Sequence, residues 1–279
     1  MQLYDFMHRY VGSRDVSDGY VVQMSYAIKS LEQFAGRTLD TQDFTVDLLN
    51  AFLRSTRDTL SAETRRHRRG LLLTLWSHAA DDNLAPPPRP RKVMPIRVPQ
   101  KLHSAWTPQQ VRQLLLAADR LEGRVFQNGV SQRWYWRSYI LAAWDSGLRG
   151  CDLRRIRQED VGGNGLVVLI QRKTGKRVQS LLRAGTLEAI GQSFPPQRET
   201  IWGEWSRIAV WRHHAKTLVT RAGLTGSIGR LRHSSGTAVE LAHPGRGHEH
   251  LGNTRRIFEQ NYLDMQQAFQ AKPMPERLV

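Results

Sequence analysis

The sequence predicts a mainly helical protein with a small β-sheet, an α+β fold divided into two domains. Three observations indicate this class: apolar residues recur at helical spacing along most of the 279 residues, a proline-rich stretch interrupts that pattern, and one β-rich stretch follows the interruption. We expect a helical domain over 1–84, a basic linker over 85–103 and a mixed domain over 104–279.

The first domain contains three expected helices with recognisable ends. In 16–36, apolar residues recur at spacings of three and four, and Gly36 supplies a stop. A second helix over 45–56 has Thr45 as its cap, and a third over 61–83 begins at Ser61 or Thr64. The basic half of the third helix is a candidate DNA-facing surface, although a solvated charged face is the alternative; it contains Arg65, Arg66, Arg68 and Arg69.

The stretch 84–100 contains six prolines, which forbid a continuing helix and stiffen the chain. Its basic residues, among them Arg91 and Lys92, either lie along phosphates or simply keep the linker soluble.

The second domain begins with a helix over 104–123, capped by Ser104 or Thr107. The stretch 134–150 predicts an apolar and therefore buried helix that ends at Gly147, and a short amphipathic helix follows over 151–161. Two β-rich runs in 165–182 flank the turn RKTGKR and predict a hairpin. Further helices are expected over 185–193, 203–222, 231–242 and 254–263.

The charge of the chain favours nucleic acid as its partner. Forty-one Lys and Arg against 25 Asp and Glu give a net charge of +16 and a pI near 10.8. Such a surface gains affinity by releasing counterions from phosphates. An acidic membrane is the rival partner, but the sequence has no long apolar run. Because Cys151 is the single cysteine, no disulfide framework is expected, and we expect a cytoplasmic, nucleoid-associated protein.

Four residues suit chemistry on a phosphodiester. Arg149 follows Gly147 at the junction of two expected helices, and Arg232 stands near the start of another, where a helix favours phosphate. Lys173 lies at the hairpin tip, with Lys176 as a close alternative and a second candidate for DNA contact. Tyr262 is either a core tyrosine or a nucleophile.

In this order, the four residues and their surroundings resemble the tyrosine recombinases, also called phage integrases. GLRGCDLRRIRQEDV is similar to the first arginine box of that family, QRKTGKRVQSLL to its hairpin lysine segment, and LRHSSGT to its second arginine box. LGN, with Tyr262 nine residues after Asn253, is similar to the family's spacing to the tyrosine. The resemblance covers residues 105–265 by motif, and residues 1–84 only in kind.

The resemblance implies a helical core-binding domain that contacts DNA and an integrase-like catalytic domain. Arg149 and Arg232 would clamp the scissile phosphate with forked donors, Lys173 would be the general acid, and Tyr262 would form a 3′-phosphotyrosyl bond. Asn253 would donate to the phosphate through its amide. No metal or cofactor is expected. The expected assembly is a homotetramer on paired duplex DNA sites, with the tail 265–279 docked on a neighbouring protomer.

Two positions depart from the family, which usually has histidine at Gly229 and histidine or tryptophan at Asn253. The departures leave a divergent but active recombinase as the first hypothesis. A DNA-binding relative with little or no catalysis, a relaxing enzyme of the type IB topoisomerase kind and a helical transcription regulator are the alternatives.

Overall fold

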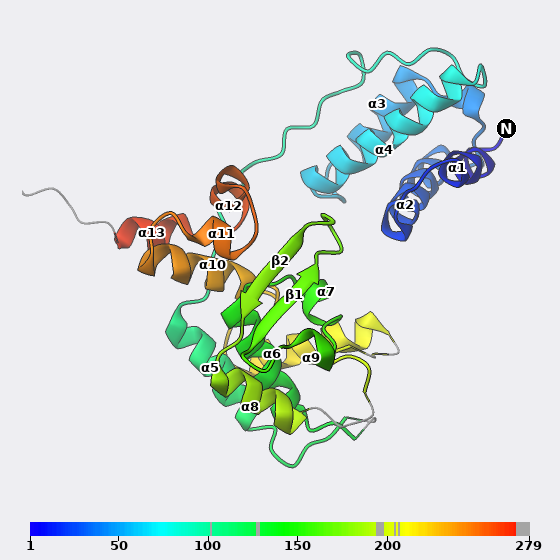
Figure 1. Ribbon diagram of the computed structural model, residues 1–279. Coiled ribbons are helices and arrows are strands. Elements are labelled where there is room, and N and C mark those ends of the chain that lie inside the picture. Colours follow the sequence, from blue (N-terminus) through cyan, green and yellow to red (C-terminus); the bar gives the residue numbers. More distant parts are fainter. Residues whose placement is uncertain (101, 127–128, 194–197, 204, 206, 272–279) are drawn as a thin grey trace, which may run out of the picture. The chain divides into compact units, whose positions relative to one another are not determined.

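The computed structural model describes residues 1–100, 102–126, 129–193, 198–203, 205 and 207–271, and its chain forms two compact units, Met1–Lys101 and Leu102–Val279 (Figure 1). The fold is mainly helical with one small antiparallel sheet, as the sequence predicts. Among the described residues, no helix combines the length and apolarity needed to cross a membrane.

The first unit consists of helices around one apolar core. Its elements are α1 (Leu3–Gly12), α2 (Asp18–Ala35), a 3₁₀ turn (Thr41–Asp43), α3 (Val46–Ser55) and α4 (Ala62–Asp81). The expected caps are present: Thr45 and Ser61 each accept a backbone N–H in the first turn of their helix, and Gly36 ends α2 in the left-handed conformation. The sequence interpretation did not define α1, whose Phe6 and Met7 are buried in the core.

The proline-rich stretch packs onto this first unit. The Trp76 indole donates to the carbonyl of Pro86 at 2.7 Å, and Val93 is 1% exposed within the core. Asn50 pairs with the backbone on both sides of Val93, at Lys92 and Met94. Residues 86–94 therefore have a fixed path, and the predicted division into domain, linker and domain stays a prediction.

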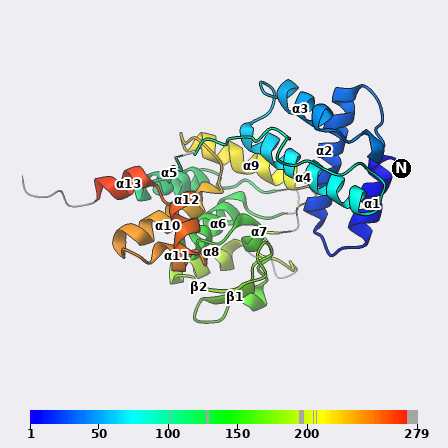
Figure 2. The ribbon, with the colours of Figure 1, turned by 90° about the horizontal axis from the view of Figure 1, so that it is seen from above.

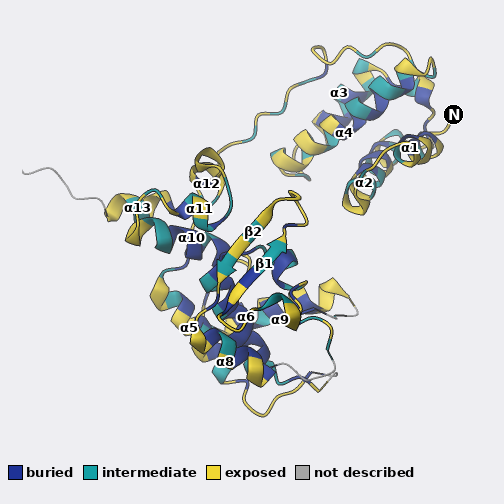
Figure 3. Ribbon diagram, viewed as in Figure 1, coloured by how far each residue is buried: buried dark blue, intermediate teal, exposed yellow. Residues whose placement is uncertain are grey.

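The second unit is built around α6, a helix whose residues are all buried or partly buried (Figure 3). Helices α5, α8 and α10 pack against α6, and α11, α12 and α13 group beside α10 (Figures 1 and 2). The helices are α5 (Pro108–Asp119), α6 (Gln132–Ser146), α7 (Gly150–Leu153), α8 (Ala184–Ser193), α9 (Ile208–Arg221), α10 (Arg230–Ala242), α11 (Gly247–His250), α12 (Arg255–Asn261) and α13 (Met265–Gln270). The hairpin pairs β1 (Leu166–Ile170) with β2 (Arg177–Leu181), Leu166 opposite Leu181.

The prediction of one helix over 151–161 is wrong. α7 ends at Leu153, and a separate 3₁₀ turn follows at Gln158–Asp160. The chain leaves the helix because its backbone pairs elsewhere: the Ile156 carbonyl accepts the N–H of Ile201 at 2.9 Å. The amphipathic pattern of this stretch comes from Leu153 and Ile156, which are buried from two different local conformations.

The C-terminal segment packs on its own chain. Gln267 of α13 donates to the Ala105 carbonyl at 3.0 Å, and α13 lies against α10. The expected docking of the tail on a neighbour falls partly on residues 272–279, which lie outside the described residues.

Candidate active site

A tight turn between α6 and α7 positions Arg149. Gly147 ends α6 at a φ of 59°, a conformation that disfavours other residues. A Cβ at Gly147 would also fall 2.5 Å from the Leu251 side chain, so glycine is required twice over. Arg149 then caps α7, and its guanidinium donates to Gln171 Oε1 at 2.7 Å and to Asn253 Oδ1 at 3.5 Å.

Arg232 enters the same place from the first turn of α10. Its side chain is buried, with the residue 5% exposed, and its two Nη atoms donate to the carbonyls of Gly147 and Leu251 at 2.6 and 2.8 Å. Within the described part of the chain, its Nε is buried and has no partner. Burial lowers the pKa of Arg232, and the nearby Tyr262 phenol opposes that effect. The guanidinium is thus held by two backbone carbonyls, and its Nε donor is buried beside them without a partner among the described residues.

Tyr262 follows the last turn of α12 and lies beside both arginines. The Arg232 guanidinium carbon is 4.8 Å from the centre of the phenol ring. Burial raises the pKa of this half-buried phenol, but charge and hydrogen bonding from Arg232 and Arg149 outweigh burial, so its pKa lies below 10.0. Two cations beside one phenol favour the phenolate, which is the nucleophilic form.

The segment carrying Tyr262 is anchored two residues further on. Asp264 Oδ2 accepts the Ala105 N–H at 2.8 Å, and the Asp264 N–H donates to Thr237 Oγ1 at 3.1 Å. Phe258 and Leu263 pack with Leu251 in a small apolar cluster around the tyrosine. The sequence interpretation missed Asp264, although an acidic residue directly before a helix is a cap signal.

Lys173 lies on the hairpin turn between β1 and β2, two residues after Gln171, whose side chain contacts Arg149. Lys173 and Lys176 are both exposed, and Lys173 makes no hydrogen bond or ion pair with any described residue. The turn itself is held, because the buried carboxylate of Asp152 accepts the Arg172 N–H at 3.0 Å. The second oxygen of Asp152 is buried and lacks a partner among described residues.

The structure therefore brings together Arg149, Arg232, Asn253 and Tyr262, and leaves Lys173 exposed on the hairpin turn. Solved structures share this architecture over nearly the whole chain. A lambda integrase dimer bound to a COC′ core site matches with a TM-score of 0.76 and 16% identity, covering 100% of this chain and 81% of that one.

A lambda integrase tetramer bound to a Holliday junction matches at 0.73 with 17% identity, covering 100% and 80%. The Tn1549 transposon integrase in complex with circular intermediate DNA matches at 0.66 with 14% identity, covering 99% and 100%.

The chain has the tyrosine recombinase fold. No protein-family model matches the sequence, and no curated protein sequence does either. At these identities the likeness shows the fold, so the roles of individual residues rest on the geometry above.

In this tyrosine recombinase fold two largely buried imidazoles lie near Arg232, and burial lowers the pKa of both. Burial, then His103 and Arg232, lower the pKa of His233 to about 4, and its ring centre is 4.9 Å from that of Tyr262. Burial likewise lowers the pKa of His250, whose Nε2 is 2.6 Å from Ser235 Oγ. At Gly229 a Cβ would have room, since it would meet Ser227 Oγ at 3.5 Å, an ordinary van der Waals contact.

The basic residues of the first unit that we expect to contact DNA are of two kinds. Arg65 donates to the Leu53 carbonyl, Arg68 to Ser30 Oγ, and Arg69 to the carbonyls of Pro90, Val93 and Met94. These three hydrogen-bonded arginines stabilise the first unit. Arg66, Arg91 and Lys92 are exposed.

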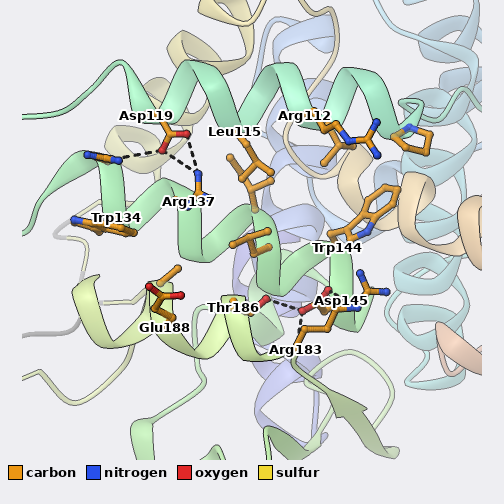
Figure 4. Close-up of a pocket in the computed structure, with 17 residues that line it drawn as sticks. Arg112, Leu115, Asp119, Trp134, Arg137, Trp144, Asp145, Arg183, Thr186 and Glu188 are labelled. Atoms are coloured by element: carbon orange, nitrogen blue, oxygen red, sulfur yellow. Dashed lines mark hydrogen bonds and ion pairs between the residues drawn. The ribbon is translucent and has the colours of Figure 1, made fainter.

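A separate concavity of about 660 Å³ lies between α5, α6 and α8 (Figure 4), and Tyr262 is not among the residues that line it. Its charges are largely paired internally: Asp119 accepts twice from Arg137, and Asp145 accepts from Thr186 and from the Arg183 N–H. None of the residues predicted to act on DNA lines it.

Proposed function

We propose that this protein is a site-specific DNA recombinase, an integrase that cleaves and rejoins strands through a 3′-phosphotyrosyl intermediate. The observation that carries the proposal is the Tyr262 phenol lying beside the guanidinium groups of Arg232 and Arg149, with its pKa lowered by them. A lowered phenol pKa with two phosphate-binding cations fits nucleophilic attack on a phosphodiester better than a core role.

In the proposed reaction the Tyr262 oxygen, having lost its proton to solvent, attacks the scissile phosphorus. The bond from phosphorus to the 5′ oxygen breaks, and Lys173 gives its proton to that oxygen, leaving a free 5′ hydroxyl. Arg149 and Arg232 stabilise the charge on the non-bridging oxygens, an effect worth about 3–4 kcal/mol per donor removed. Attack by a 5′ hydroxyl of a second strand on the phosphotyrosine reverses the steps and rejoins DNA.

The proposed partner is double-stranded DNA, and the proposed assembly is a homotetramer on paired sites. The net charge of +16 supports the first. The lambda integrase tetramer on a Holliday junction, which shares this fold, supports the second. We assign DNA contact in the first unit to the exposed Arg66, Arg91 and Lys92, and DNA contact on the hairpin to Lys176. The hydrogen-bonded residues Arg65, Arg68 and Arg69 stabilise the first unit.

One specific observation favours a second candidate, a DNA-binding relative that cleaves weakly. Gly229 and Asn253 lack the imidazoles usual in the family, and Lys173 is exposed on its turn and makes no hydrogen bond or ion pair with any described residue. A relaxing enzyme of the topoisomerase kind would use the same phenol without exchanging strands.

Covalent capture tests the proposal. The protein first selects its binding site from a random-sequence duplex library. Duplexes of that site are then nicked at successive positions, so that the short cleaved fragment diffuses away and the adduct persists on denaturing gels. We expect an adduct from the wild type and from Tyr26→Phe, whose tyrosine is exposed in the first unit, but none from Tyr262→Phe.

Specific binding without an adduct at any nick would instead support the DNA-binding relative. Adduct formation with plasmid relaxation, but without recombinant products from paired sites, would support the relaxing enzyme.

A further inference from the structure

Gln171 is a buried carboxamide in direct contact with Arg149. It stands at the end of β1, where its residue is 1% exposed. Its Oε1 accepts from Arg149 at 2.7 Å and from Thr174 Oγ1 at 2.8 Å. Its backbone N–H donates to the Lys176 carbonyl at 2.8 Å, which closes the turn. The side chain therefore has a fixed place at the centre of the candidate site.

The contact with Arg149 also identifies which carboxamide atom of Gln171 faces the guanidinium. A guanidinium can only donate, so the atom facing Arg149 must be the oxygen. The other end, Nε2, is then a donor that is buried and, over the described ranges of the chain, unpartnered. An unpartnered buried donor costs about 1–3 kcal/mol, and such groups are rare without a ligand to complete them.

A second carboxamide has the same arrangement. Asn253 Oδ1 accepts from the other Nη of Arg149, and its Nδ2 is also buried without a partner in the described structure. Gly252, the neighbour of Asn253, adjoins Gln171, since a Cβ on Gly252 would lie 3.6 Å from Gln171 Nε2. Two amides thus flank one guanidinium, and each retains an N–H₂ group that no atom of the described residues accepts from.

We propose that Gln171 is a further substrate-binding residue of this site, whose Nε2 donates a hydrogen bond to a non-bridging oxygen of the scissile phosphodiester. This inference rests on the proposed function. Its oxygen holds Arg149 while its nitrogen binds the same phosphate, so the neutral amide adds a donor beside the two arginines. Because an amide does not titrate, this donor is present at every pH at which the protein is folded.

Two substitutions separate phosphate binding from the holding of Arg149. Gln171→Glu keeps an oxygen for Arg149 but replaces the donor with a negative oxygen facing the phosphate. Gln171→Met removes both contacts at similar volume. We expect each to slow adduct formation by about 100-fold or more. Gln179→Glu, at an exposed position of β2, places the same charge on the same hairpin and should cost no more than a few-fold.

A rate for Gln171→Glu near that of the wild type, with Gln171→Met slow, would show that Gln171 only positions Arg149 and would overturn the proposal. So would wild-type rates from both variants.

A modified substrate tests the contact itself. A methylphosphonate at the scissile position replaces one non-bridging oxygen by a methyl group, in either of two stereoisomers. For the isomer lacking the oxygen that Nε2 contacts, the penalty of Gln171→Met should shrink to the part that comes from losing the Arg149 contact, and for the other isomer the full penalty should persist. Equal penalties on both isomers and on normal DNA would contradict the contact.

A binding measurement decides the case even without cleavage. In the Tyr262→Phe background, Gln171→Glu should weaken affinity for the selected duplex about tenfold relative to Gln171→Met, because the carboxylate repels the phosphate. If the wild type binds that duplex without forming an adduct, the proposed chemistry fails while this difference still decides the role of Gln171; equal affinities would overturn it.

Discussion

Acid should destabilise the second unit through His233, and the size of the effect follows from its surroundings. Burial, with His103, Arg232 and Arg230 nearby, lowers the pKa of His233 from 6.5 to about 4. The folded state therefore takes up this proton at a lower pH than the unfolded state does. The stabilisation is complete above pH 6.5 and is lost as the pH falls from 6.5 toward 4.

Between pH 7 and pH 4.5 the expected loss in free energy of unfolding from this one group is about 2 kcal/mol, at 1.36 kcal/mol for each unit of pKa difference. Urea unfolding at the two pH values, followed by tryptophan fluorescence, measures it, since seven of the eight tryptophans lie beyond residue 101. The difference between the pH values should shrink by that amount in His233→Gln. Any constant loss from the substitution cancels in this difference.

His243→Gln, at an exposed histidine after α10, serves as the control and should retain the wild-type pH dependence. His250, whose pKa is also lowered by burial, contributes equally to wild type and variant. If His233→Gln loses as much stability in acid as the wild type does, then burial does not lower the pKa of His233 and this prediction is wrong.

Three further predictions concern DNA. Arg66→Ala should lower the salt dependence of duplex binding by about one released counterion and leave the melting temperature unchanged. Its matched control, Arg69→Ala, should instead destabilise the first unit by about 2 kcal/mol, because the Arg69 donors satisfy three backbone carbonyls. The adduct-formation rate should rise with pH and level off below pH 10, since the pKa of Tyr262 is lowered; a rise continuing past pH 10 would contradict this. Lys173→Ala should slow cleavage of normal DNA at least about 100-fold. It should slow cleavage of a 5′-bridging phosphorothiolate only a little, because the thiolate leaves without a proton. Equal slowing on both substrates would exclude Lys173 as the general acid.

The sequence was sufficient for most elements of the fold. Caps at Thr45 and Ser61, the stop at Gly36 and the turn RKTGKR are local signals, and the structure has each where the residues place it. The helix expected over 151–161 failed because its end depends on pairing of Ile156 with a segment more than forty residues away, which no local pattern records.

The candidate site was predictable only where local sequence signals define it. Gly147 and Arg149 form a recognisable helix junction, but nothing in their neighbourhood indicates which residues the guanidinium meets. Gln171 was missed, although one polar residue closing the apolar run of β1 was an available signal. In the basic helix, the sequence shows charge but not that Arg69 is directed at backbone carbonyls of a later segment.

The most direct test of the account is the chemical identity of the covalent link. An adduct from nicked duplex would be digested with protease and nuclease, and the modified peptide sequenced by mass spectrometry. We predict a nucleotide attached through its 3′-phosphate to Tyr262. Attachment to any other residue, or through a 5′-phosphate, would contradict the central claim.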